Sequence, residues 1–201
     1  MKVWTDGSAL SNPRGAMGWA WVDDKGAHDS GGARLGTNQI GELTGVLMAL
    51  KAHPTGSLTI ITDSQYVVNV FTKWSKGWQR KDWTLRDGGK VKNLPLIRTI
   101  RAMLDTRKDK VQFQWTKGHS RSRGNNRADE LANGYANKVK DGNFPDRVPP
   151  ECVKTLQESE VVQTGKTEHR RKRGLYHRPG DSKHGHWRMI DGNHYHNGRR
   201  K

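Results

Sequence analysis

The chain has 201 residues, a formal net charge of +16, a pI near 10.2 and a mean hydropathy of −0.96. An excess of positive charge this large indicates a polyanionic partner, most often a nucleic acid, although a merely soluble basic protein is the alternative. Its one cysteine, Cys152, excludes an intramolecular disulfide and a cysteine-based zinc site. The sequence has no signal peptide and no apolar run near the ~20 residues that span a membrane, which predicts a cytoplasmic protein without a membrane partner.

The first quarter of the chain has the signals of strands followed by a helix. Short strands are predicted over residues 2–6, 18–22 and 28–34, with a hairpin turn at residues 23–26 between the last two. A helix is predicted over residues 42–52, because apolar residues recur there at i, i+3, i+4 and i+7. Three neighbouring strands before a helix indicate that the sheet is partly antiparallel.

The next part alternates between strands and helices. A strand is predicted over residues 58–62, helical spacing follows over residues 67–74, and a further helix is predicted over residues 94–107. Apolar and polar residues alternate over residues 111–115, which is typical of a half-buried strand, and a last helix is predicted over residues 126–137. The order β-β-β-α-β-α-α-β-α predicts an α/β protein whose mixed sheet carries helices on its faces.

From residue 138 onward the apolar periodicity fades. Residues 138–201 hold 15 Lys and Arg against 8 Asp and Glu, and six of the nine histidines. We therefore predict a globular domain over residues 1–137 and a largely disordered, basic and His-rich extension over residues 138–201, with a small folded piece around residues 187–195. Two H-x-H pairs on either side of Trp187 leave a zinc site open, but a His-rich arm without metal is the favoured interpretation.

Four acidic residues stand at the ends of predicted elements. Asp6 ends the first strand, Glu42 begins the first helix, Asp63 lies at a strand-to-helix junction, and Asp129 lies in the first turns of the last helix. Such ends meet at the active sites of open sheets. Converging carboxylates repel one another, and divalent cations such as Mg²⁺ relieve that repulsion. Taken singly, each acid has a structural alternative as a helix cap, a helix-dipole partner or a turn residue.

Five short motifs surround these acids. In chain order they are Thr5-Asp6-Gly7-Ser8, Thr37-Asn38 to Glu42-Leu43, Thr62-Asp63-Ser64-Gln65-Tyr66, Lys117-Gly118-His119 and Ala128-Asp129-Glu130-Leu131-Ala132. Their order and spacing over residues 1–137 resemble the successive motifs of type 1, cellular-type ribonuclease H. The resemblance implies the ribonuclease H-like fold, a five-stranded mixed sheet flanked by helices. It also implies that two Mg²⁺ ions, or Mn²⁺ ions, support hydrolysis of the RNA strand of RNA/DNA hybrids, leaving 3′-hydroxyl and 5′-phosphate ends.

The resemblance further implies roles for individual residues. Asp6, Glu42, Asp63 and Asp129 match the metal-binding acids of the family. His119 lies in a polar loop before the last helix and matches a histidine that assists proton transfer or product departure. The alternative for His119 is a surface histidine without a role.

A second set of residues is expected to contact the nucleic acid. Residues 73–83 interleave cations, which bind phosphates, with indoles, which can stack, and they resemble the basic protrusion of cellular-type members. We expect Trp74 to be largely buried and Trp78 or Trp83 to face the substrate; the alternative is that all three are core residues. Because the 2′-hydroxyl distinguishes RNA from DNA, the shape of the hybrid should be recognised rather than its base sequence. The predicted substrate-binding residues are Asn12, Thr37, Asn38, Gln65, Trp78, Arg80, Lys81, Trp83, Lys90 and Asn93.

Two other functions fit part of the pattern. One is a nuclease of the same fold that acts on DNA, against which the Lys-Gly-His loop and the basic protrusion argue. The other is a catalytically silent hybrid-binding module, which would not need four acids. We expect a monomer whose partner is an RNA/DNA hybrid duplex.

Overall fold

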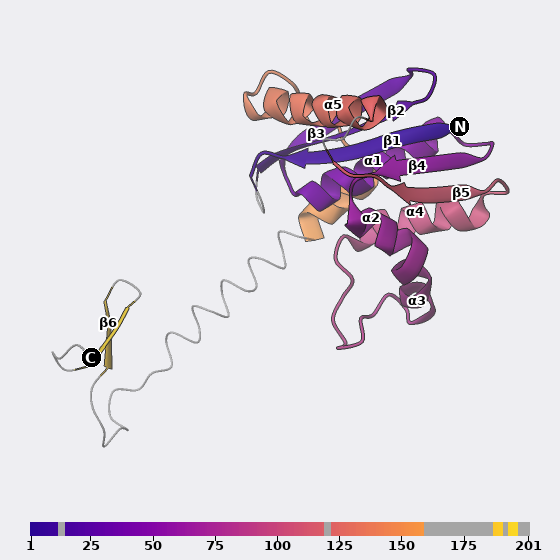
Figure 1. The fold of residues 1–201 in the computed structure, drawn as a ribbon. Helices are drawn as coiled ribbons and strands as arrows, with labels where there is room; N and C mark the ends of the chain where they lie inside the picture. Colours follow the sequence, from indigo (N-terminus) through magenta and orange to yellow (C-terminus); the bar gives the residue numbers. More distant parts are fainter. Residues whose placement is uncertain (12–14, 119–121, 159–186, 191–192, 197–201) are drawn as a thin grey trace. The chain divides into compact units, whose positions relative to one another are not determined.

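The structure is a computed structural model that describes residues 1–11, 15–118, 122–158, 187–190 and 193–196 (Figure 1). It divides into two compact units, residues 1–161 and 162–201. In the second unit, strands β6 (Trp187–Ile190) and β7 (Asn193–His196) pair antiparallel, where the sequence predicts a small folded piece. None of the helices described is both long and apolar enough to cross a membrane.

The first unit is built on a mixed sheet of five strands. They are β1 (Lys2–Ala9), β2 (Gly15–Asp23), β3 (His28–Gly36), β4 (Leu58–Thr62) and β5 (Val111–Trp115). Their order in the sheet is β3-β2-β1-β4-β5. The pairs β1–β2 and β2–β3 are antiparallel, and the pairs β1–β4 and β4–β5 are parallel. The predicted α/β fold with a five-stranded mixed sheet is confirmed.

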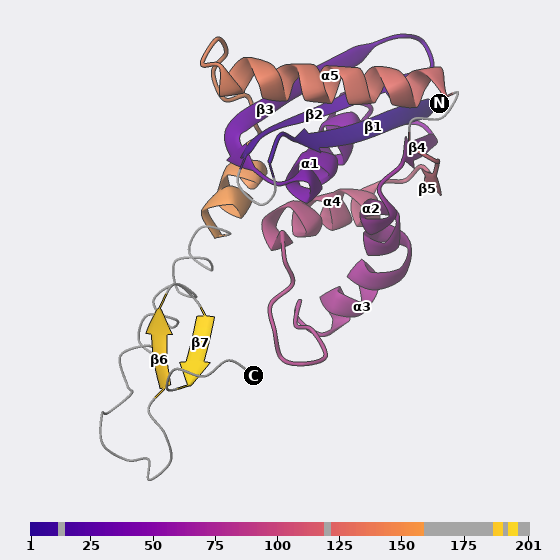
Figure 2. The ribbon, with the colours of Figure 1, turned by 60° about the vertical axis from the view of Figure 1, so that its left-hand side comes forward.

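Helices cover both faces of this sheet (Figures 1 and 2). One face carries α5 (Arg123–Lys140), which contacts β1, β2 and β3. The other face carries α1 (Asn38–Ala52), which packs against α4 (Leu94–Thr106). Between α1 and α4 in the chain come α2 (Gln65–Asn69), the π-helical turn η1 (Val70–Trp74) and α3 (Ser75–Arg80).

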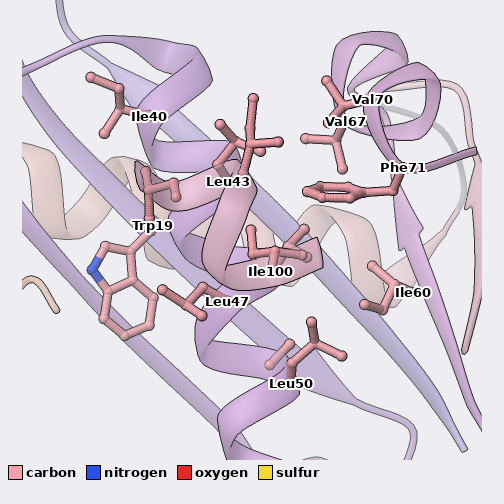
Figure 3. Close-up of a cluster of buried hydrophobic side chains, with 14 of the residues drawn as sticks. Trp19, Ile40, Leu43, Leu47, Leu50, Ile60, Val67, Val70, Phe71 and Ile100 are labelled. Atoms are coloured by element: carbon pink, nitrogen blue, oxygen red, sulfur yellow. The ribbon is translucent and has the colours of Figure 1, made fainter. Parts of the chain in front are cut away.

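The main hydrophobic core lies between α1, α4 and the sheet (Figure 3). Leu43 and Leu47 of α1, Ile60 of β4 and Ile100 of α4 are fully buried. Almost every residue of α1 from Ile40 to Leu50 is buried, so this helix has no polar face and is enclosed by its neighbours. A buried α1 gives a rigid base to the residues at its N-terminal end.

Residues 145–158, here called the strap, fold back onto the first unit and cover the outer edge of β3. The main chains of Arg147 and Gly32 hydrogen-bond in both directions, at 3.0 and 2.7 Å. The Arg147 guanidinium binds both carboxylate oxygens of Asp29, and the Arg147 carbonyl accepts from the Trp19 indole at 2.9 Å. The strap therefore pairs an edge that would otherwise be open.

The second half of the strap is helical over residues 150–158 and packs beside α1. Cys152 is fully buried, and Val148 and Leu156 lie against the same core. Lys51 of α1 forms an ion pair with Glu151 at 3.2 Å. Residues that the sequence assigns to the extension thus contribute to the compact unit that carries the predicted domain.

Removing the strap is expected to destabilise this unit. A chain that ends at Asp141 loses the pairing at β3 and leaves a cavity where Cys152 and its neighbours pack. We expect its free energy of unfolding to lie about 3 kcal/mol below that of a chain ending at Glu158, measured by urea unfolding. In the full chain, Arg147→Ala should reproduce part of the loss, whereas Arg98→Ala at an exposed position of α4 should not. Equal unfolding midpoints for the two shortened chains would show that the strap adds no stability.

Candidate active site

Asp6 and Glu42 come together because glycines let β1 and α1 approach closely. A β-carbon on Gly7 would lie 2.0 Å from the main-chain nitrogen of Glu42. A β-carbon on Gly41 would lie 2.6 Å from the carbonyl oxygen of Gly18. No larger residue fits at either position unless α1 moves away from the sheet.

Both carboxylate oxygens of Glu42 accept a hydrogen bond. Asn38 donates its Nδ2 to Oε1 at 2.9 Å, and Ser64 donates its hydroxyl to Oε2 at 2.6 Å. The Ser64 hydroxyl also caps α2, because it accepts from the Val67 main chain at 3.2 Å. Burial raises the pKa of Glu42 to about 7; the hydrogen bond from Ser64 opposes this rise, and the negative charge of Asp63 adds to it.

Asp6 is the most buried acid of this site, with 6% of its surface exposed. Its Oδ1 accepts from the main chain of Gly7 at 2.8 Å. Burial raises the pKa of Asp6 to about 8, and the charges of Asp63, Asp129 and Glu42 act in the same direction. Within the described residues, no Lys, Arg or His forms an ion pair with Asp6, Glu42 or Asp63. These three carboxylates therefore lack a cation from the described residues that would neutralise them.

Asp63 directly follows β4 and is held by three other segments. Trp115, at the end of β5, donates its indole Nε1 to the Asp63 carbonyl at 3.0 Å. Asn125 of α5 donates its Nδ2 to the Asp63 carboxylate Oδ2 at 3.2 Å. Gly118 lies against the same oxygen, since a β-carbon there would be 2.8 Å away. Asp129 follows Asn125 by one turn of α5 and completes the set of acids.

The four acids are close enough to influence one another's charge, but they do not form a ready-made metal site. In the part of the chain that the structure describes, no group of three or more Asp, Glu, His or Cys side chains is placed to hold a metal ion. The geometry therefore does not confirm the predicted metal cluster, and metal binding stays a prediction. Like charges without a cation between them favour an open arrangement. The donor chemistry nevertheless suits a hard cation, because it consists of carboxylate oxygens, two of them buried.

Three of the predicted substrate-binding residues lie at the starts of helices near the acids. The Thr37 hydroxyl caps α1, Asn38 holds Glu42, and Gln65 is exposed at the start of α2. Asn12 and His119 lie outside the described residues, so their predicted roles stay predictions.

Among the tryptophans of the predicted protrusion, Trp74 differs from expectation because it is exposed, whereas the contact of Trp78 or Trp83 with the substrate stays a prediction. Trp74 is 39% exposed, whereas Trp78 and Trp83 are partly buried against the core. The π-helical turn that ends at Trp74 inserts an extra residue into the helix, which rotates later side chains away from the positions that α-helical spacing predicts. Asp82 and Trp83 then adopt φ angles of 47° and 58°, and the Trp83 main chain donates to the Trp78 carbonyl at 2.7 Å.

The cations of the protrusion are accessible. Arg80 ends α3, Lys81 directly follows it and Lys90 lies in the loop before α4, and all three are exposed. Asn93 ends this loop with a φ of 57° and donates its Nδ2 to the Tyr66 hydroxyl at 3.2 Å. Because Tyr66 lies in the first turn of α2, this contact ties the end of the protrusion to the neighbourhood of the acids.

Three residues that position the acids are not among the residues that the sequence predicts for the site. Ser64 has a signal, because a serine before a helix is a common N-cap. Asn125 also has one, since it precedes Asp129 by four residues and so shares its helix face. The alternation over residues 111–115 predicts Trp115 on the buried face of β5, but Trp115 is 46% exposed, because the strand ends there and its indole turns to the main chain of Asp63.

Comparison with known proteins matches the first two thirds of the chain. The RNase H family model matches residues 1–137. A ribonuclease H of Tropheryma whipplei (strain Twist) is 39% identical over 135 residues, which cover 66% of this chain and 82% of that protein. A ribonuclease H of Bordetella pertussis is 38% identical over 137 residues, which cover 66% and 86%.

Solved structures resemble the fold. A type 1 RNase H with the type 2 active-site motif superposes with a TM-score of 0.58 at 22% identity, over 75% of this chain and 77% of that chain. The foamy viral protease-reverse transcriptase in complex with dsDNA gives a TM-score of 0.59 at 24% identity, over 67% and 92%.

Proposed function

Because this chain belongs to the RNase H family and is a ribonuclease H enzyme, we propose that it cuts the RNA strand of RNA/DNA hybrids with the help of two divalent metal ions. The observation that supports this proposal most is the convergence of four acids, Asp6, Glu42, Asp63 and Asp129. Burial raises the pKa of Asp6, and the charges of the other three acids raise it further. Buried carboxylates without a counterion are costly for stability, so a functional reason for them is expected.

The four acids would hold Mg²⁺, or Mn²⁺, in this proposal. Bound ions would activate a water and stabilise the leaving oxygen of the phosphodiester, giving 3′-hydroxyl and 5′-phosphate ends. Asn38 and Ser64 keep the Glu42 carboxylate in one orientation. Gly118 and Asn125 restrain the orientation of the Asp63 carboxylate. His119 is proposed to transfer a proton or to assist product departure, by resemblance to the family.

The substrate would lie across the acids and the protrusion. Thr37, Asn38 and Gln65, together with Asn12, are proposed to approach the RNA strand near its 2′-hydroxyls. The exposed cations Arg80, Lys81 and Lys90, with Trp78, Trp83 and Asn93, are proposed to contact the phosphates and sugars of the DNA strand. We propose that the chain acts as a cytoplasmic monomer.

A panel of labelled duplexes tests this function. With Mg²⁺ present, we expect cuts only in the RNA strand of an RNA/DNA hybrid, and none in duplex DNA, in duplex RNA or in any sample with excess chelator. The 5′-phosphate is checked by ligation of the downstream product. Cutting of duplex DNA would favour a DNA nuclease of this fold, and tight hybrid binding without cutting would favour a silent binding module.

A further inference from the structure

Asn125 is a buried amide beside the acids whose hydrogen bonds are only partly satisfied. It is 1% exposed, and its Nδ2 donates to the Asp63 carboxylate Oδ2 at 3.2 Å. Its Oδ1 is buried and accepts no hydrogen bond from the residues that the structure describes. Buried polar atoms without a partner are rare and costly, which indicates that this amide has a role beyond packing.

The main chain under Asn125 is fixed on two sides. Ser122 caps α5, and its hydroxyl accepts from the Asn125 main chain at 3.4 Å. Gly124 packs directly on the indole of Trp4, because a β-carbon there would lie 2.2 Å from the ring. Asp129, four residues later, projects from the same face of the helix. The bond from Asn125 therefore joins Asp63, which directly follows β4, to the helix that carries Asp129.

This bond decides which oxygen of Asp63 is available. Oδ2 is occupied by Asn125 and enclosed by Gly118, while Oδ1 accepts no hydrogen bond from the described residues. Without the amide, the short Asp63 side chain can turn to other rotamers. Hydrogen bonds that hold a metal ligand in place commonly contribute about 10–100-fold to metal affinity or activity.

We propose that Asn125 is a positioning residue that holds Asp63 with Oδ1 free for a divalent cation and so sets the cation affinity of the acids; this inference rests on the proposed function.

A metal titration without substrate tests the proposal on the full chain. The Trp115 indole N–H, bonded to the Asp63 carbonyl, provides an NMR signal beside the site. We expect Asn125→Ala to weaken Mg²⁺ binding about 10–100-fold, and Asn125→Leu, which fills the side-chain volume without hydrogen bonds, to do the same. Asn126→Ala, at the exposed neighbouring position, should stay within about twofold of the unchanged protein. At saturating Mg²⁺, KM for the hybrid should be unchanged in both Asn125 variants.

Two results separate this inference from the proposed function. Mg²⁺ affinities within twofold of the unchanged protein in both Asn125 variants would overturn the positioning role, whatever their activity. An unchanged protein that binds Mg²⁺ but leaves the hybrid intact would overturn the proposed function, and the titration would still report on Asn125. Chelator-treated variants that unfold cooperatively by thermal melting confirm that the affinities refer to folded protein.

Discussion

Replacing Asp63 by Asn is expected to lower the rate of hybrid cleavage by about 1,000-fold while the fold is retained. The substitution removes one negative charge from the acids but keeps the size of the side chain. The amide oxygen of the new residue can still accept from Asn125, and the bond from Trp115 goes to the main chain and is unaffected. The loss should therefore appear in kcat for a labelled hybrid, with little change in binding.

A matched control for this substitution lies on α5. Glu130 is 69% exposed at its side chain and pairs with Arg127, so Glu130→Gln also removes a negative charge near the site without touching the acids. We expect its kcat to stay within about twofold, because exposed ion pairs contribute little. An Asp63→Asn variant that retains more than about a tenth of the activity would contradict the assignment of Asp63 to the reaction.

The sequence predicted the elements with regular apolar spacing and the acids that stand at element ends. The alternation in Val111–Trp115 predicted β5 correctly, and the helical period from Leu43 to Leu50 predicted α1. Asp6 and Glu42 could be placed together in advance because both stand at element ends. The distance between Asp6 and Glu42 could not be predicted, because it depends on how closely Gly7 lets β1 approach α1.

Features that depend on long-range contacts were not predictable in this way. Val148, Cys152 and Leu156 recur every four residues, which is a helical signal, but the prolines before Glu151 favoured a linker. The pairing of Arg147 with Gly32 joins residues far apart in the chain and has no local signature. The exposure of Trp74 depends on a π-helical turn, which no spacing rule anticipates.

The charge of the acids should also make the metal-free protein sensitive to pH. Burial raises the pKa of Asp6 to about 8 and that of Glu42 to about 7, whereas both groups titrate near pH 4 in the unfolded chain. Between about pH 4 and 8 the folded protein therefore binds more protons than the unfolded chain, and its stability falls as pH rises. In chelator, the urea midpoint should be higher at pH 5 than at pH 8.

Asp6→Asn is expected to remove most of this pH dependence and to stabilise the metal-free protein while abolishing cleavage. Each unit of difference between the folded and unfolded pKa of Asp6 corresponds to about 1.4 kcal/mol of stability. Because the shift is shared among coupled acids, we expect the substitution to raise the free energy of unfolding by about 3 kcal/mol at pH 7.5. The new amide can still accept from the Gly7 main chain. Saturating Mg²⁺ should stabilise the unchanged protein more than the variant, since the cation neutralises charge that the variant lacks. A variant less stable than the unchanged protein in chelator would show that the Asp6 carboxyl carries no electrostatic cost in the fold, and the case for a cation at this site would then lose its electrostatic basis.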